Sequence, residues 1–151
     1  GMSSRLFREI RELRGLAYAV HAFRMPFADA GANAVYVGTT PNQTSEVLKL
    51  VRGEMDKLME SGVTDEELQR AKGHIQGSLA ISLEDADGRM NRLGRSEISG
   101  MEHRSVDEIV ELVDAVTGEE VIEVSRAAYG GPYVIGATGP FEDSDLEEFV
   151  R

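Results

Sequence analysis

Residues 1–18, GMSSRLFREIRELRGLAY, decide how the fold begins. Ser3 or Ser4 can cap a helix, and the apolar residues that follow recur on one side of it at helical spacing. A glycine is the usual residue just after the last helical turn, so we expect Gly15 to end this helix. The apolar side consists of Leu6, Phe7, Ile10 and Leu13. The segment therefore predicts a small-residue loop, a short cationic helix, a stop, and a strand that contains Tyr18.

A hairpin is expected next. Residues 16–26 alternate like a strand, the stretch 29–31 (Asp-Ala-Gly) is a turn signal, and residues 32–39 read as the returning strand. The alternation predicts that one face of the first strand carries Leu16, Tyr18, Val20 and Ala22. The many alanine and glycine residues of the second strand indicate that another element packs closely on this sheet.

Helix-start signals divide the rest of the chain. Residues 40–43 and 64–67 have capping-box patterns, and residues 105–108 and 117–120 open two further helices. From Thr64 the apolar residues keep helical steps as far as residue 97, which predicts one helix of about eight turns. Asp85-Ala86-Asp87-Gly88 is the place where such a helix would bend. An apolar run between Gly-Pro breaks, Tyr133 to Ala137, predicts a third, buried strand.

This order of elements predicts an α+β fold in which an antiparallel sheet packs against several helices in two layers. A chain of 151 residues fits a single domain, so we expect residues 1–151 to form one. Three strands are few for so much helix, and a further strand is expected upstream of Gly1. Without it the sheet keeps an unpaired edge, through which a second copy of the chain can add to form a homo-oligomer.

Charge and composition exclude several classes of protein. The net charge is −11, and thirteen of the acidic residues against three arginines fall in residues 101–151. An acidic body repels phosphate, so we expect no nucleic-acid partner. Cysteine is absent, which excludes disulfides and thiolate metal ligands. No apolar run approaches the roughly 20 residues of a membrane helix, so we expect a soluble protein without a membrane partner. The compartment stays open on the sequence, with the cytoplasm favoured.

The order of the opening motifs resembles the M16 zinc peptidases, the pitrilysin, insulinase and mitochondrial-processing-peptidase group. The similarity is to the C-terminal half of these enzymes. Gly-Met-Ser-Ser-Arg-Leu at 1–6 resembles the end of a glycine-rich loop, and Arg11 with Tyr18 resembles the family's arginine and tyrosine seven residues apart. The helix start at residues 64–68 and the segment 116–121 also resemble the family, so the resemblance covers nearly the whole chain.

The resemblance implies that this chain is the substrate-binding half of an endopeptidase acting on peptides or unfolded polypeptides. Its partner would be a zinc-bearing N-terminal half, in the same chain or in a separate subunit. Arg11 and Tyr18 would then be catalytic, because a phenol can donate a hydrogen bond to an oxyanion and a guanidinium can bind a substrate carbonyl. Gly1, Met2 and Ser3 would bind substrate. The ordinary alternatives are a packed tyrosine, a solvated arginine and a simple helix cap.

Zinc ligands are not predicted in this chain. None of its three histidines, His21, His74 and His103, begins an H-x-x-E-H or H-E-x-x-H motif. The resemblance therefore implies that zinc, the cofactor of the parent enzyme, is bound by the other half, and that this chain alone is inactive. The paired carboxylates at 66–67 and 119–120 lie at helix starts, where the helix dipole favours acids.

Two other functions remain open on the sequence. The first is a non-catalytic M16-like subunit with a structural or interaction role, which would cleave nothing with any partner. The second is an unrelated α+β binding module that resembles the family by accident. A structure without the helix and hairpin at residues 3–39 would favour that last interpretation.

Overall fold

The computed structural model describes residues 3–27, 29–140 and 146–149. Its first elements are the π-helix η1 (Phe7–Glu12), the strands β1 (Ala17–Pro26) and β2 (Gly31–Thr39), and the 3-10 helix η2 (Pro41–Gln43). The helices that follow are α1 (Thr44–Ser61), α2 (Asp65–Ser82), α3 (Ala86–Ile98), α4 (Val106–Ala115), α5 (Gly118–Tyr129) and the 3-10 helix η4 (Glu147–Phe149).

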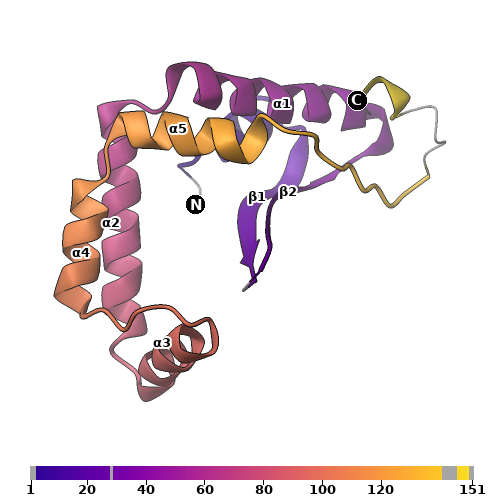
Figure 1. Ribbon diagram of the computed structural model, residues 1–151. Helices are drawn as coiled ribbons and strands as arrows, with labels where there is room; N and C mark the ends of the chain where they lie inside the picture. The colour runs from indigo at the N-terminus through magenta and orange to yellow at the C-terminus, as the bar shows by residue number, and fades with distance from the viewer. Residues whose placement is uncertain (1–2, 28, 141–145, 150–151) are drawn as a thin grey trace.

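Four of the helices pack as two pairs, and the hairpin lies beneath one of them (Figure 1). Helices α1 and α5 lie side by side as one layer, and β1 and β2 project from beneath that layer. Helices α2 and α4 form a second pair that leads away from the first, and α3 lies at its far end. The predicted α+β class, with an antiparallel sheet packed against several helices, is confirmed.

The sheet has two strands within the described residues. β1 and β2 are antiparallel, and His21 lies opposite Tyr36 near the middle of the ladder. The prediction of a third strand at 133–137 is wrong, because this segment is not part of a ladder and Val134 is 96% exposed. An apolar run becomes a buried strand only where a neighbouring strand pairs with its backbone and another layer covers it, and no described element does either here.

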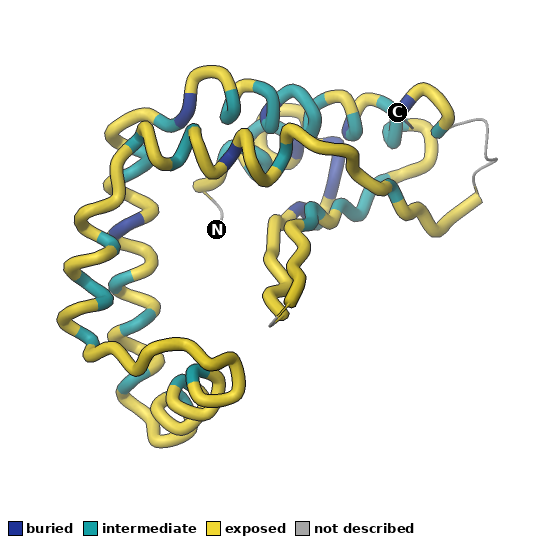
Figure 2. Tube along the Cα trace, in the orientation of Figure 1, coloured by how far each residue is buried: buried dark blue, intermediate teal, exposed yellow. Residues whose placement is uncertain are grey.

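The core is small and lies where the first helix, the hairpin and α1 meet (Figure 2). Ile10 and Val47 are its most deeply buried side chains, at 0% and 2% exposure. The rest of the cluster comes from the start of β1 and from neighbouring half-buried residues: Leu16, Ala17, Val20, Leu6, Phe7, Val37, Leu50 and Val51. Most of the residues beyond this cluster are exposed, so the opening helix is among the best-anchored parts of the molecule.

Three helix starts are capped as their sequences predict. The hydroxyls of Thr64, Ser105 and Thr117 each accept a hydrogen bond from the backbone N–H three residues later. The glutamate at that later position accepts a hydrogen bond in return from the capping residue's own N–H. Residues 40–43 differ, since the Thr40 hydroxyl bonds the Gln43 side chain and a 3-10 turn precedes α1. Reciprocal caps need only local geometry, which explains why the other three could be predicted.

The long helix predicted for residues 64–97 is divided into α2 and α3. The Asp85 carboxylate accepts hydrogen bonds from the backbone N–H groups of Asp87 and Gly88, so it caps a new helix instead of continuing the old one. Gly88 is required there, because an added Cβ would lie 1.7 Å from the Ser82 carbonyl oxygen. The expected site of bending is therefore a complete break.

Gly62, between α1 and α2, is expected to tolerate no side chain. Its backbone has φ 69° and ψ −143°, a region that essentially only glycine occupies. A Cβ would also lie 2.6 Å from Cγ1 of Ile122 in α5. Gly62→Ala is therefore expected to lower the free energy of unfolding by about 1 to 3 kcal/mol in urea titrations.

Gly53 gives the matched control for that substitution. It lies inside α1, where a Cβ would meet nothing within 4 Å. Gly53→Ala should raise stability by roughly 0.5 to 1 kcal/mol, because alanine is the better helix former. Equal effects of the two substitutions would contradict the assigned backbone geometry at Gly62.

Candidate functional site

The helix that carries Arg11 is wound as a π-helix. The N–H of Leu13 bonds the carbonyl of Arg8, five residues earlier, at 2.9 Å. π-helical turns are rare and often occur at functional sites. Gly15, with φ 64°, ends the helix as predicted, and its N–H bonds the Arg11 carbonyl at 3.1 Å. The neighbouring Ile10 is buried in the core. The backbone at Arg11 is therefore held by Ile10 before it and by the hydrogen bond from Gly15 after it.

The start of β1 aims Tyr18 outward. Ala17 lies opposite Thr39 and Ala19 opposite Gly38, so the register shifts by one residue and Tyr18 has no partner in the β2 ladder. Such irregularities turn a side chain away from the regular alternation. Tyr18 is 84% exposed although Val20, two residues on, is 8% exposed. The prediction that these two residues share a face is therefore wrong.

Arg11 and Tyr18 lie side by side. The Cζ atom of Arg11 is 5.1 Å from the centre of the Tyr18 ring and 4.8 Å from the centre of the Phe7 ring. Both distances are within the range of a cation–π interaction. The structure thus brings together the guanidinium and the phenol that the sequence analysis singled out. Phe7 is a third member of this group, which the sequence analysis assigned only to the apolar side of the helix.

Glu9, two residues before Arg11, is already paired with another arginine. Glu9 accepts a hydrogen bond from Nη1 of Arg14 at 2.5 Å, and Arg8 lies 4.0 Å from it. The hydrogen bond from Arg14 lowers the pKa of Glu9. Within the described residues, Arg11 itself makes no hydrogen bond or ion pair through its guanidinium. Its donors are therefore available to a ligand.

A partly buried ion pair connects the start of this helix to α2. Nε and Nη2 of Arg5 donate to the two carboxylate oxygens of Glu67, each at 2.6 Å, and Nη2 also donates to the Gly62 carbonyl at 2.9 Å. The bond from Arg5 lowers the pKa of Glu67 to about 2. Arg5 therefore binds a residue of another element and not Glu9, the acid one turn further along its own helix.

Comparison with known proteins identifies the family. A family model described as the peptidase M16 inactive domain matches residues 1–74. An uncharacterized zinc protease of Streptomyces coelicolor is 45% identical over 143 residues, which is 95% of this chain and 31% of that protein. YmxG of Bacillus subtilis, also described as an uncharacterized zinc protease, is 34% identical and is matched over 92% of this chain and 34% of its own length.

The chain belongs to the M16 peptidase family. A crystal structure of the peptidase M16 inactive domain from Pseudomonas fluorescens has the same fold, with a TM-score of 0.75, 24% identity, and coverage of 85% of this chain and 30% of that one. The predicted match to a C-terminal M16 half is confirmed, and the unrelated binding module is excluded. The chain spans about a third of the length of the relatives that it matches.

The residues predicted to bind substrate in this M16 domain lie before the π-helix. Gly1 and Met2 fall outside the described residues. Ser3 is exposed in a turn, and Ser4 is the residue that caps the helix, because its hydroxyl accepts a hydrogen bond from the N–H of Phe7 at 3.3 Å. Ser3 therefore remains available for other contacts.

The histidines of the M16 domain do not form a zinc site. His21 lies beside the rings of Phe23 and Tyr36 on the hairpin, and His103 bonds Glu97 at 2.9 Å. His74 lies apart from both, on α2. Over residues 3–27, 29–140 and 146–149, no group of three or more histidine, aspartate or glutamate side chains is arranged to hold a metal ion. The described residues therefore do not fit zinc, and we assign none of them to it.

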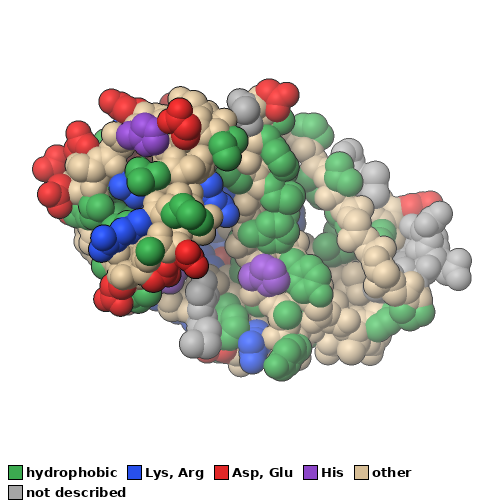
Figure 3. Space-filling view, turned by 90° about the horizontal axis from the view of Figure 1, so that it is seen from below, with side chains coloured by type: hydrophobic (Ala, Val, Ile, Leu, Met, Phe, Trp, Pro, Cys, Tyr) green, Lys and Arg blue, Asp and Glu red, His purple; other side chains and the backbone are tan. Residues whose placement is uncertain are grey.

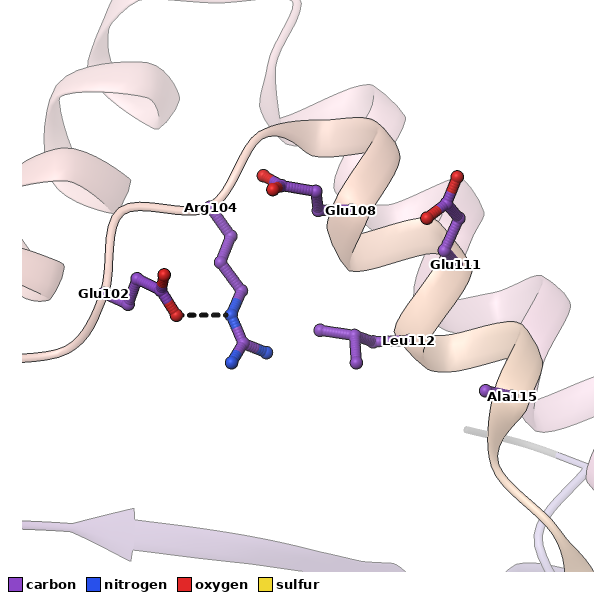
Figure 4. A pocket seen from close by; sticks show the side chains of 6 residues that line it. All are labelled: Glu102, Arg104, Glu108, Glu111, Leu112 and Ala115. Atoms are coloured by element: carbon purple, nitrogen blue, oxygen red, sulfur yellow. Dashed lines mark hydrogen bonds and ion pairs between the residues drawn. The ribbon is translucent and has the colours of Figure 1, made fainter.

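Two shallow hollows on the described surface lie away from the pair of Arg11 and Tyr18. One, of about 400 Å³, is lined by α4 and the loop before it, where Arg104 bonds Glu102 and extends toward Leu112 (Figure 4). A second, of about 310 Å³, lies between the hairpin and Tyr129 at the end of α5. Arg11 and Tyr18 line neither of them. The pair therefore stands on an open surface.

The M16 domain exposes far more surface than a compact protein. Its accessible area is 11072 Å², against about 7,500 Å² expected for a compact monomer of the same mass. Hydrophobic side chains gather across the centre of the face from which the hairpin and α3 project (Figure 3). None of the described helices is both long enough and apolar enough to cross a membrane. The domain thus carries an unusually large exposed surface with apolar side chains on it.

Proposed function

We propose that this chain is the substrate-binding half of a zinc-dependent endopeptidase that cleaves peptides or unfolded polypeptides. The observation that carries the proposal is the pairing of Arg11 with an outward-facing Tyr18. The two groups stand together on an open surface, and the Arg11 donors are not used within the described residues. On this proposal the chain is inactive alone.

The two side chains suit the oxyanion side of peptide hydrolysis. Negative charge develops on the scissile carbonyl oxygen, and the Tyr18 hydroxyl can donate a hydrogen bond to it. The guanidinium of Arg11 can donate to a neighbouring substrate carbonyl and hold the peptide in position. The zinc of the other half would supply the activated water. Each role assigned here to this chain is binding or orientation.

The proposed partner is a zinc-bearing N-terminal half, in the same polypeptide or in a separate subunit. The exposed apolar surface supports it, because such area is stable in water only when another surface covers it. The relatives described as zinc proteases are about three times as long as this chain, which leaves room for that half. The exposed turn at Ser3 supports a second contact, in which Gly1, Met2 and Ser3 offer backbone N–H groups to the substrate.

A non-catalytic M16 subunit is the second candidate function. The description of the matching family model as an inactive domain favours it. In this candidate Arg11 and Tyr18 are remnants of the shared framework. It predicts no cleavage with any partner half.

Reconstitution separates the two candidates. The chain is mixed with a zinc-bearing M16 half from the same organism, and cleavage of a quenched fluorescent peptide is measured. We expect turnover only in the mixture, with none from the chain alone. Light scattering should show a one-to-one complex. For the chain alone it should show a homodimer, since the hairpin edges are then open to a second copy.

The zinc-bearing half assayed by itself is the control. Formation of the complex without any gain in cleavage over that half would favour the non-catalytic subunit. A chain that forms no complex would contradict both candidates.

A further inference from the structure

We propose that Phe7 is a positioning residue for Arg11. The proposal rests on the proposed function, because it gives the ring a role only if Arg11 binds substrate. The Cζ atom of Arg11 lies 4.8 Å from the centre of the Phe7 ring and 5.1 Å from that of Tyr18. The guanidinium is therefore bounded by two aromatic rings, one from its own helix and one from β1.

The two rings differ in how firmly they are held. Phe7 is half-buried and packs against the core that contains Ile10 and Val47. Its backbone N–H donates a hydrogen bond to the Ser4 hydroxyl oxygen. Tyr18 is 84% exposed and has no partner in the β2 ladder. Phe7 is thus the fixed surface of the pair, and the position of the guanidinium depends on it more than on Tyr18.

Stacking on a ring suits an arginine that must bind a carbonyl. A guanidinium lying against an aromatic face keeps its N–H donors directed outward from the ring, and it gives up fewer rotamers when it binds. A nearby carboxylate would compete for those donors. Glu9 is held by Arg14, in the turn after the helix, and within the described residues neither Glu9 nor the adjacent Glu12 forms an ion pair with Arg11. The helix therefore keeps Arg11 ordered without occupying its donors.

The test uses the assembled, zinc-loaded peptidase that contains this chain and a fluorescent peptide substrate. Phe7→Leu keeps an apolar side chain and removes the ring. We expect kcat/KM to fall about fivefold, the size that one partly exposed cation–π contact supports. Phe7→Tyr keeps the ring and should restore kcat/KM to within about twofold of the wild type. Leu6→Val, which alters the adjacent core contact without touching Arg11, should leave kcat/KM unchanged.

A double-mutant cycle distinguishes positioning from simple packing. Arg11→Met removes the donors, so adding Phe7→Leu to it should cause no further loss. A full fivefold loss in the Arg11→Met background would overturn the positioning role and leave the proposed function intact. An Arg11→Met enzyme with wild-type kcat/KM would overturn both. Circular dichroism and thermal unfolding of each variant exclude loss of fold as the cause.

Discussion

Tyr18→Phe is expected to reduce kcat of the assembled peptidase by about 100-fold while KM changes little. Removing one hydrogen-bond donor to a developing oxyanion costs roughly 100- to 1000-fold in kcat. The substitution removes a single hydroxyl from a residue that is 84% exposed. It keeps the ring on which Arg11 stacks. Packing and the position of Arg11 should therefore persist, and the loss should appear in the chemical step.

Steady-state kinetics with a peptide substrate measure this loss, and Tyr36→Phe is the matched control. Tyr36 is also on the hairpin and half exposed, at 52%, but its ring contacts His21 instead of Arg11. Its substitution should leave kcat within about twofold, because surface changes away from a site are usually small. Unchanged turnover of a correctly folded Tyr18→Phe enzyme would exclude the hydroxyl from catalysis.

Glu67→Gln is expected to lower the free energy of unfolding by about 2 to 3 kcal/mol at neutral pH. Glu67 accepts two hydrogen bonds from Arg5 and a third from the N–H of Thr64. The bond from Arg5 lowers the pKa of Glu67 from 4.5 to about 2. Both side chains of the pair are more than two thirds buried, so solvent screens this pair less than a surface pair.

The same pKa predicts how stability depends on pH. Because the folded-state pKa of Glu67 is lowered, its contribution is complete above the unfolded pKa near 4.5 and is lost as pH falls toward about 2. Urea unfolding followed by circular dichroism at pH 7, 4 and 3 should show the wild type losing this advantage. The difference between wild type and Glu67→Gln should shrink over that range.

Glu66→Gln is the control for both measurements. Glu66 lies in the same turn but is 86% exposed, and it pairs only with Arg70. Its substitution should have little effect on stability at any of these pH values, because exposed pairs contribute little. A Glu67→Gln variant as stable as the wild type at pH 7 would show that Arg5 does not tie the opening helix to α2.

Local signals in the sequence predicted the elements that depend on local contacts. Gly15 ends the first helix in the left-handed conformation, which glycine adopts at little cost because it has no Cβ. Thr64 caps α2 through a residue three positions away. The hairpin forms because its turn and its alternation lie within one short segment. In each case the stabilising partner is only a few residues distant along the chain.

The failed predictions all depend on distant partners or on irregular backbone. The apolar run at 133–137 satisfies the strand pattern, but no described strand pairs with it. The contact of Arg5 with Glu67, 62 residues further on, is likewise one that no local pattern predicts, since Glu9 lies only one turn away. Tyr18 was predicted to share a face of the strand with Val20, and the shift of register beside it could not be read from an alternating pattern.

By itself the sequence determined the order of most elements, three of the helix caps, and the spacing of Arg11 and Tyr18 on either side of Gly15. Only the tertiary structure decided that Arg11 lies between the rings of Phe7 and Tyr18. The reason is geometric. Spacing fixes how far apart two residues are along the chain, but the π-helical turn and the irregular start of β1 set the directions of their side chains. Those directions are held by a core that includes Val47, which belongs to α1, a helix well beyond Tyr18 in the sequence.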